Sequence, residues 1–248
     1  MKAAEEPQSI CIYLDWDSEF FGHRIARANP RRLDDRSMKE LLRWCSENRV
    51  ECVYLLGDSD DPQTSRLAEA SGFLLADVRI TLERAVDQPG AALTSVMMRF
   101  ACEEDLEALR AIARTVHHDT RFYFDGHFDR AKCDQFYETW IAQSVGGYAQ
   151  VVFVAEVERK PVGYITGDLR GEEAQIGLLG VANGYRGASV GSTLVRHFLG
   201  WAAKEGAKHA VVVTQGRNLR AQRLYQRCGF VTASCQLWYH RWFLIEKR

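Results

Sequence analysis

Hydrophobic and polar positions along the chain follow two periods, and the period identifies each element. Short apolar or alternating runs predict strands, and apolar residues three or four positions apart predict helices. The first part predicts strands over 9–15, 50–56 and 73–82 and helices over 37–48 and 62–70. The remainder predicts strands over 95–100, 150–157, 161–169, 174–181, 209–214 and 230–244, helices over 103–116, 129–144, 191–204 and 218–227, and an irregular segment over 117–128.

The segment 87–92, Asp-Gln-Pro-Gly-Ala-Ala, is the most linker-like stretch of the chain. The chain has 248 residues, of which 46% are hydrophobic, so it can bury a substantial core and hold two domains. We therefore predict one domain over 1–88 and a second over 93–248.

The two parts also resemble each other. Shifted by 157 residues, 37–84 lies on 194–241 without a gap; Trp44 then meets Trp201 and Gly72 meets Gly229. Two features do not repeat: Ala68 stands where the second part has Tyr225, and 29–34 stands in place of a glycine turn. A chance match between two helix–strand units is the alternative to a degenerate copy that keeps the packing and has lost the chemistry.

Charge and cysteine usage exclude several classes of protein. The net charge of −1 lacks the basic footprint of a nucleic-acid binder. None of the seven cysteines forms a CxxC pair, which indicates reduced thiols and neither a disulfide frame nor a zinc site. The first seven residues lack the apolar core of a signal peptide, and no apolar run is long enough for a bilayer. We expect a cytoplasmic protein without nucleic acid, membrane insertion or metal.

The strongest chemical signal is a glycine turn between a predicted strand and a predicted helix. Such a turn presents backbone N–H groups and a positive helix end to a phosphate. A plain strand–turn–helix corner is the alternative. The turn consists of Arg186, Gly187, Ala188, Ser189, Val190, Gly191 and Ser192.

Tyr225 lies in the short helix that follows the next strand. A pyrophosphate cradle beside a phenol suits a transferase that takes an acyl group from a nucleotide-linked thioester. The phenol, with a pKa of about 10, is protonated at neutral pH and can act as general acid toward a thiolate leaving group with a pKa of about 8.5. A packed core tyrosine is the alternative. Asn218 suits an N-cap as well as a cofactor contact.

With these motifs, 95–244 resembles the GNAT superfamily of acyl-CoA-dependent N-acyltransferases. The resemblance rests on the Arg186-Gly187-x-x-x-Gly191 turn and on the Asn218…Ala221…Leu224-Tyr225…Gly229-Phe230 signature. It implies an α/β (α+β) fold with a mixed, mostly antiparallel sheet flanked by helices, preceded here by a smaller degenerate GNAT-like α/β domain. The family normally has glycine where this chain has Ser189, whose hydroxyl offers a phosphate contact instead.

The resemblance also implies roles for individual residues. Acetyl-CoA is the expected co-substrate; N–H groups of 186–192 would hold its pyrophosphate, and Leu179 and Val181 would align its pantetheine arm. Asn218 and Ala221 would assist, and Tyr225 would be the general acid. The residues leave the base open between Glu173, Asp168, His117, His118 and a water chain.

A narrower resemblance links the segments 14–22 and 120–128, together with Tyr137 and Trp140, to the TDP-fucosamine acetyltransferase branch. It implies direct N-acetylation of a nucleotide-linked (TDP) amino-deoxysugar, with Arg121, Phe122 and Tyr123 at the acceptor. Alternatives are a GNAT acting on a protein N-terminus, a lysine or a small amine, and a non-catalytic acyl-CoA-binding module. The oligomeric state is open, with a homodimer as one option.

Overall fold

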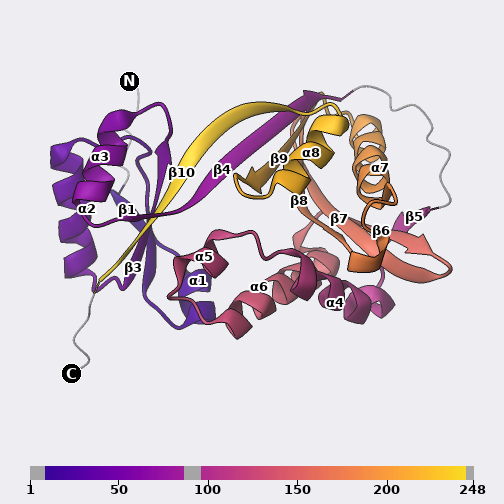
Figure 1. Cartoon of the computed structure of the whole chain (residues 1–248), viewed down its shortest axis with the longest axis horizontal. Coiled ribbons are helices and arrows are strands. Elements are labelled where there is room, and N and C mark those ends of the chain that lie inside the picture. The colour runs from indigo at the N-terminus through magenta and orange to yellow at the C-terminus, as the bar shows by residue number, and fades with distance from the viewer. Residues whose placement is uncertain (1–8, 87–95, 244–248) are drawn as a thin grey trace, which may run out of the picture. The chain divides into compact units, whose positions relative to one another are not determined.

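The computed structural model describes residues 9–86 and 96–243, which divide into two compact units (Figure 1). Of these residues, unit 1 contains 9–79, 121–129 and 235–243, and unit 2 contains 80–86, 96–120 and 130–234. The units are therefore not contiguous halves of the chain. The predicted linker 87–92, and with it the predicted boundary between 88 and 93, lies outside the described residues.

Unit 1 is built on a mixed sheet. Strand β2 pairs with β3 in parallel, and the pairs β1–β2 and β3–β10 are antiparallel. The sequence did not predict α1, β2 or α5, because each is only four to seven residues long and carries little periodicity. The elements are β1 (Cys11–Tyr13), α1 (Asp15–Phe21), β2 (Ile25–Ala28), α2 (Asp35–Glu47), β3 (Cys52–Asp58), α3 (Pro62–Ala70), part of β4 (Leu74–Ala85), α5 (Arg121–Asp125) and most of β10 (Val231–Trp242).

The two faces of this sheet differ in character because side chains alternate along each strand. On one face, Val53, Leu55 and Tyr239 join a core that includes Met38 and Leu41 of α2. The neighbouring positions on β3 and β10 project from the other face, where aromatic and polar side chains gather.

Unit 2 contains more of the described residues than unit 1 does. Strands β5 to β8 form an antiparallel series, and β8 pairs with β9 in parallel. The sheet is therefore mixed and mostly antiparallel, which confirms the prediction. The elements are β5 (Met97–Phe100), α4 (Leu106–Val116), α6 (Arg130–Gln143), β6 (Val151–Val157), β7 (Lys160–Arg170), β8 (Glu173–Val181), α7 (Val190–Lys204), β9 (His209–Gln215) and α8 (Leu219–Arg227).

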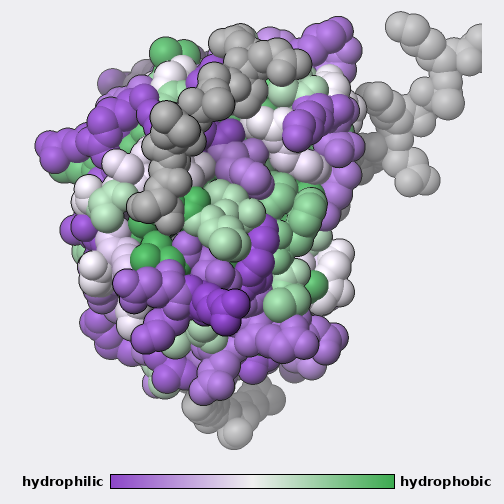
Figure 2. All heavy atoms as spheres, turned by 90° about the vertical axis from the view of Figure 1, so that its right-hand side faces the viewer, coloured by the Kyte–Doolittle hydropathy of each residue, from purple (hydrophilic) through white to green (hydrophobic). Residues whose placement is uncertain are grey.

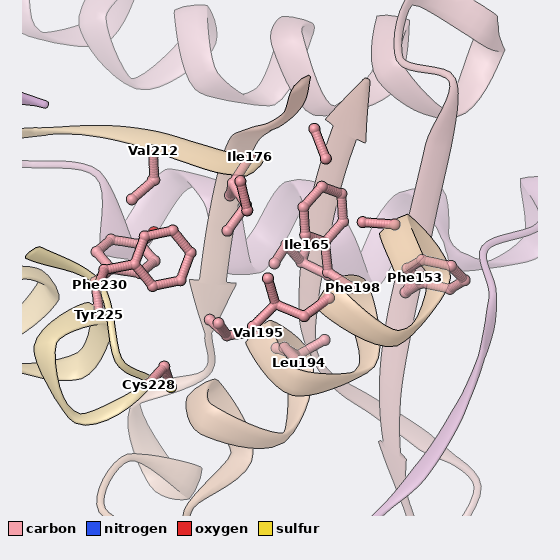
Figure 3. Packing of buried hydrophobic residues seen from close by; sticks show 14 of the residues in the cluster. Phe153, Ile165, Ile176, Leu194, Val195, Phe198, Val212, Tyr225, Cys228 and Phe230 are labelled. Carbon is pink, nitrogen blue, oxygen red and sulfur yellow. The ribbon is translucent and has the colours of Figure 1, made fainter. Parts of the chain in front are cut away.

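Helices cover both faces of the unit 2 sheet (Figure 1). On one face, Leu194, Val195 and Phe198 of α7 pack against Ile165 and Ile176 (Figure 3). Gly167 makes room for this helix, because an added Cβ would lie 2.1 Å from the Phe198 ring. Helix α4 lies on the other face with α6. Figure 2 shows the molecular surface from the right-hand side of Figure 1; this surface carries mostly hydrophilic side chains with smaller apolar areas between them.

The predicted repeat appears in the element bounds. Strand β3, helix α3 and strand β4 begin and end 157 residues before β9, α8 and β10. The caps repeat as well: Asp61 caps α3 and Asn218 caps α8, and Gly72 and Gly229 both have a left-handed φ. The last strand of each copy of the repeat pairs with the other copy. In unit 1 the neighbour of β3 is β10, and in unit 2 the neighbour of β9 is β4.

Candidate functional site

Strands β8 and β9 of unit 2 separate after a short paired stretch. Their register runs from Glu173 opposite His209 to Ile176 opposite Val212, whereas β8 continues to Val181. No further β8–β9 pair follows in the described part of the chain. The predicted cofactor residues Leu179 and Val181 lie in this diverging segment, where the backbone on the β9 side lacks a strand partner.

The glycine turn lies directly after β8 and leads into α7, a helix of 15 residues. Gly187 has a φ of 84°, which glycine adopts without strain. Ser189 is the N-cap with a φ of 60°, and its side chain makes no capping bond. Within the described ranges, no group accepts a hydrogen bond from the backbone N–H groups of 187–192. The turn and the first turn of α7 therefore present free donors.

The electrostatics of the turn also favour an anion. The pKa of Arg186 is lowered by desolvation and next by the positive charge of Arg220, while Asp119 opposes this shift. Two guanidinium groups thus lie close enough to repel each other beside a helix N-terminus. An anion between them would relieve this repulsion and receive the free N–H groups.

Gly191 connects the turn with two other predicted site elements. An added Cβ there would lie 3.1 Å from Cδ2 of Leu224 on α8 and 3.8 Å from Cγ2 of Val181 on β8. The turn, the end of β8 and helix α8 therefore meet at this glycine, and only a small residue fits between them. Of the predicted residues, the structure brings together those from Leu179 to Ser192 and those on α8.

Tyr225 is buried in the unit 2 core, with its ring 5.7 Å from that of Phe230 in an edge-on contact (Figure 3). Burial, and then the neighbouring Cys228, raises the pKa of the phenol above its ordinary value, so the group is protonated at neutral pH. The Tyr225 hydroxyl makes no hydrogen bond with the described residues. The hydroxyl oxygen is nevertheless not fully enclosed, so part of it is accessible to a ligand. In the first copy of the repeat, formed by β3, α3 and β4, the residue equivalent to Tyr225 is the buried Ala68.

Asn218 serves as a helix cap. Its Oδ1 accepts a hydrogen bond of 3.0 Å from the backbone N–H of Ala221. Asp61 caps α3 at the equivalent position of the first copy, which has no glycine turn. The capping role of Asn218 is therefore common to both copies, and a cofactor contact would use its remaining amide N–H groups.

The predicted acceptor residues lie in α5, which belongs to unit 1, whereas the other predicted site residues belong to unit 2. The sequence expectation of an irregular segment over 117–128 was wrong for 121–125. The guanidinium carbon of Arg121 lies 4.4 Å from the ring centroids of both Phe122 and Trp238, and 4.9 Å from that of Tyr54. Arg121 is thus enclosed by aromatic rings. Tyr123 is half-buried.

The structure distinguishes among the candidate bases. Nε2 of His117 lies 2.7 Å from the hydroxyl of Tyr164, and the imidazole stacks on Tyr137 with ring centroids 4.7 Å apart. Burial, followed by the charges of His118 and Arg186, lowers the pKa of His117 to about 3, so its neutral form persists at neutral pH. The sequence reasoning missed Tyr164, because no local pattern distinguishes it from a core residue of β7.

The Tyr164 ring lies against β8 near the turn. A Cβ on Gly180 would come within 2.7 Å of the ring and 2.9 Å of the hydroxyl oxygen. Glu173 is at the opposite end of β8, about 26 Å from Val181 along the strand. Asp168 pairs with Gln175 near that same far end and accepts a bond from the N–H of Gln150. His117 reaches the strand beside the turn through Tyr164 and Gly180, whereas Nε2 of the exposed His118 lies 2.9 Å from the carbonyl oxygen of Arg114.

The described residues contain neither a cluster of three or more potential metal-ligating His, Cys, Asp or Glu side chains nor a helix long and apolar enough to cross a bilayer.

Residues 112–230 match the model of the acetyltransferase (GNAT) family. Spore coat polysaccharide biosynthesis protein SpsD of Bacillus subtilis (strain 168) is 31% identical over 140 residues, which cover 56% of this chain and 48% of that protein. The chain thus spans about half the length of this curated relative.

Two solved structures share the fold at low sequence identity. A GCN5-related N-acetyltransferase from Sphaerobacter thermophilus superimposes with a TM-score of 0.69 and 16% identity, covering 94% of this chain and 76% of that one. A tandem GNAT protein from the clavulanic acid biosynthesis pathway gives a TM-score of 0.60 and 12% identity, covering 91% of this chain and 77% of that one.

Proposed function

This chain carries a GNAT acetyltransferase domain over residues 112–230, and from this premise we propose that it moves an acetyl group from acetyl-CoA to the amino group of a nucleotide-linked (TDP) amino-deoxysugar. The transfer is direct, from the thioester to the amine. The observation that carries the proposal is the free-donor turn after β8, beside the segment where β8 leaves β9.

The backbone N–H groups from Gly187 to Ser192 bind the pyrophosphate of the co-substrate, and the predicted Arg186 contributes its side chain, because its own N–H donates to the carbonyl of Asn183. Each hydrogen bond to a charged acceptor contributes about 1.5–3 kcal/mol, and the end of α7 adds up to about 1 kcal/mol. The Ser189 hydroxyl makes no hydrogen bond with the described residues and is available for a phosphate oxygen. The exposed backbone of Leu179 and Val181 aligns the pantetheine arm.

Tyr225 acts as the general acid. Acetyl-CoA supplies an activated acyl thioester, and the thiolate that leaves it needs a proton or a strong hydrogen bond. The Tyr225 phenol is in its protonated form, because burial raises its pKa. Its Oη can therefore donate that proton, and such a positioned acid accelerates a reaction about 10²–10⁴-fold.

His117 is the base that we favour among the predicted candidates. Its ring is held by Tyr164 and Tyr137 near Gly180 on β8, and its partial exposure allows an amine to reach it. When Nε2–H donates to the Tyr164 hydroxyl, the lone pair of Nδ1 is free to accept a hydrogen bond from the attacking amine. Because the pKa of His117 is lowered to about 3, the imidazole does not keep the proton, which passes on to water. A water bound between the amine and His117 serves the same purpose.

Two features support the proposed acceptor: residues of unit 1 and the name of one relative. Arg121 suits an anionic diphosphate, and the half-buried ring of Tyr123 suits a base or a deoxysugar face. The predicted Phe122 is buried and supports this segment from within. The name of the Bacillus subtilis relative refers to polysaccharide biosynthesis, which supports a sugar acceptor for this chain. We place the reaction in the cytoplasm, where seven unpaired thiols remain reduced.

The decisive assay measures thiol release from acetyl-CoA with three panels of acceptors: TDP-amino-deoxyhexoses, peptides and small amines. We expect efficient turnover of the nucleotide sugar and poor turnover of the free amino sugar, since remote binding energy positions the reacting atoms. Efficient acetylation of a peptide or small amine, with no turnover of any nucleotide sugar, contradicts the acceptor. Binding of acetyl-CoA without thiol release to any acceptor supports the non-catalytic alternative.

A further inference from the structure

Helix α5 has five residues, too few to be stable on its own, so its orientation depends on what anchors it. The segment 121–129, which contains α5, belongs to unit 1, whereas the described chain on either side of it belongs to unit 2. The place of Arg121 and Tyr123, the residues proposed to meet the acceptor, therefore depends on how α5 is fastened within unit 1.

One face of α5 is held against the unit 1 sheet by aromatic contacts. The Arg121 guanidinium lies over the rings of Tyr54 on β3 and Trp238 on β10. The buried ring of Phe122 stacks on that of Phe21 in α1, with centroids 5.1 Å apart. Apolar packing of this kind is only weakly directional. It keeps α5 on the sheet without fixing its rotation.

Asp125, the last residue of α5, supplies the directional contact. Its side chain is 3% exposed, and its carboxylate accepts hydrogen bonds from Nδ1 of His240 and, at 2.9 Å, from Nε1 of Trp242, both on β10. The backbone N–H of His127 donates to the same carboxylate at 3.1 Å. Hydrogen bonds to an ionised acceptor are stronger than those between neutral groups. Asp125 thus fastens the end of α5 to one place on β10.

Burial and hydrogen bonding fix the charge of this contact. Burial opposes ionisation of Asp125, but the hydrogen bonds from His240 and Trp242 outweigh it and lower the pKa of the carboxyl group below its ordinary value. Burial lowers the pKa of His240 to about 4, although the hydrogen bond to Asp125 opposes this shift. At neutral pH the contact joins a carboxylate to a neutral imidazole whose proton lies on Nδ1.

Ring stacking keeps the two donors of β10 in place. The rings of Tyr54 and His240 stack with centroids 4.4 Å apart, and those of His127 and Trp242 with centroids 4.8 Å apart. The donors are therefore preorganised, and the position of α5 follows from that of the Asp125 carboxylate.

The anchored face of α5 determines which residues the helix presents elsewhere. Arg121 and Asp125 are four positions apart and share one helix face, whereas Tyr123 and Phe124 lie on another. Phe124 is 58% exposed, and Tyr123 is half-buried. A rotation of α5 would move the anchored and the exposed residues together.

We propose that Asp125 is a positioning residue for the acceptor: by fixing the end and the rotation of α5 on β10, it determines where Arg121 and Tyr123 meet the substrate. The inference rests on the proposed function, which places the acceptor at α5. The Asp125 carboxylate is buried and does not touch the substrate. Its effect is on recognition of the acceptor and not on acetyl-CoA.

Hydrogen exchange measures the anchoring without any substrate. Asp125→Asn keeps the size of the side chain but turns an amide N–H toward a donor, and Trp242→Phe removes one donor and keeps a ring. Mass spectrometry of the peptide that contains α5 should show at least tenfold faster exchange in Asp125→Asn than in the native chain, and a smaller increase in Trp242→Phe. Unchanged exchange of this peptide in both variants overturns the proposal.

Steady-state kinetics tests the consequence. We expect Asp125→Asn to raise the KM of the acceptor about tenfold and to leave the KM of acetyl-CoA unchanged. Should this variant fail to fold, Trp242→Phe carries the same comparison, with a smaller rise in the same KM. An unchanged acceptor KM in a variant whose α5 exchanges faster overturns the positioning role.

Thr64→Val is the matched control for stability. The buried Thr64 hydroxyl oxygen accepts a hydrogen bond of 2.6 Å from the N–H of Leu33, and Ala68 of the same helix packs in the core on the other face of the sheet. This variant should lower the melting temperature and leave both KM values unchanged. An equal rise of the acceptor KM in Thr64→Val would assign the effect of Asp125 to stability alone and overturn the proposal.

The outcomes separate this inference from the proposed function. If nucleotide sugars are acetylated with the same acceptor KM in the native chain and in Asp125→Asn, the positioning role fails and the function stands. If a peptide or small amine is acetylated instead, and its KM rises in Asp125→Asn, the positioning role stands and the proposed acceptor fails. If no acceptor of any class is acetylated, both fail.

Discussion

The hydroxyl oxygen of Tyr164 lies 2.7 Å from Nε2 of His117, and its ring occupies the space that a side chain on Gly180 would need. The phenol thus links the imidazole at the end of α4 to the backbone of β8. This contact fixes the orientation of His117 beside the strand on which the thioester is proposed to lie. Tyr164 is a positioning residue in this arrangement.

His117→Ala should lower kcat about 10²-fold, the lower range for loss of a positioned base. His118→Ala is the matched control, because His118 is the adjacent, exposed histidine. Because the pKa of His117 is lowered to about 3, the activity of the native enzyme should show no inflection from this group above pH 5. Equal activity of both variants in a steady-state assay of thiol release would remove His117 from the mechanism.

The lowered pKa of His240 predicts a loss of stability in acid. The folded-state pKa is about 4, whereas an unfolded histidine titrates near 6.5. Between these values the unfolded chain binds more protons, so stability is complete above pH 6.5 and falls toward pH 4, with a slope of up to about 1.4 kcal/mol per pH unit. Urea unfolding at several pH values should show a smaller slope for His240→Asn. An identical slope would mean that other groups control the acid transition.

Tyr225→Phe should fold normally and still bind acetyl-CoA, because it removes one oxygen and keeps the packing against Phe230. We expect turnover to fall about 10²–10⁴-fold, the range for a positioned acid. Steady-state kinetics with saturating acetyl-CoA tests this expectation. A change of only a few-fold would assign Tyr225 to the core alone.

Gly191→Asp should greatly reduce CoA affinity, since it adds both a side chain and a negative charge at the turn. Gly191→Ala separates the two effects. Its Cβ would lie 3.1 Å from Cδ2 of Leu224, which demands a small adjustment but adds no charge. Calorimetry should therefore rank native, Ala and Asp in order of decreasing affinity. If the Asp variant binds CoA as well as the native chain does, the turn does not hold the pyrophosphate.

Deletion of residues 1–88 should give insoluble or inactive protein, whereas deletion of 1–8 should be tolerated, since that stretch has no apolar pattern. The physical reason for the first outcome is the strand exchange. The deletion removes β3, the partner of β10 in unit 1, and β4, the neighbour of β9 in unit 2. Solubility and activity of both fragments can be measured after expression. A soluble and fully active 89–248 fragment would show that the first part is dispensable.

The local pattern of apolar and polar residues was enough to predict the elements that carry the proposed cofactor site. The prediction of a helix over 191–204 and a strand over 174–181 differs from α7 and β8 by one residue at one end. The glycine turn is similarly readable, because Gly187 adopts a left-handed φ within the turn itself. These features depend on residues close together in the chain.

The repeat of 157 residues was also visible in the sequence, since copied packing preserves the spacing of apolar residues and caps. The sequence could not show that the copies exchange their last strands. A strand's alternation identifies its two faces but not its neighbour, so β10 alone is equally compatible with pairing to β3 or to β9.

Only the tertiary structure brought His117 to Tyr164, and Tyr54 and Arg121 to His240. These contacts join positions from 47 to 186 residues apart in the chain. Their geometry depends on strand register and on which helix covers which face. The sequence by itself determined the longer elements, the turn and the position of Tyr225 on α8, because their signals are local, whereas it missed the short α1, β2 and α5. Long-range pairing decided which buried polar groups stand together, and no short window of sequence contains that information.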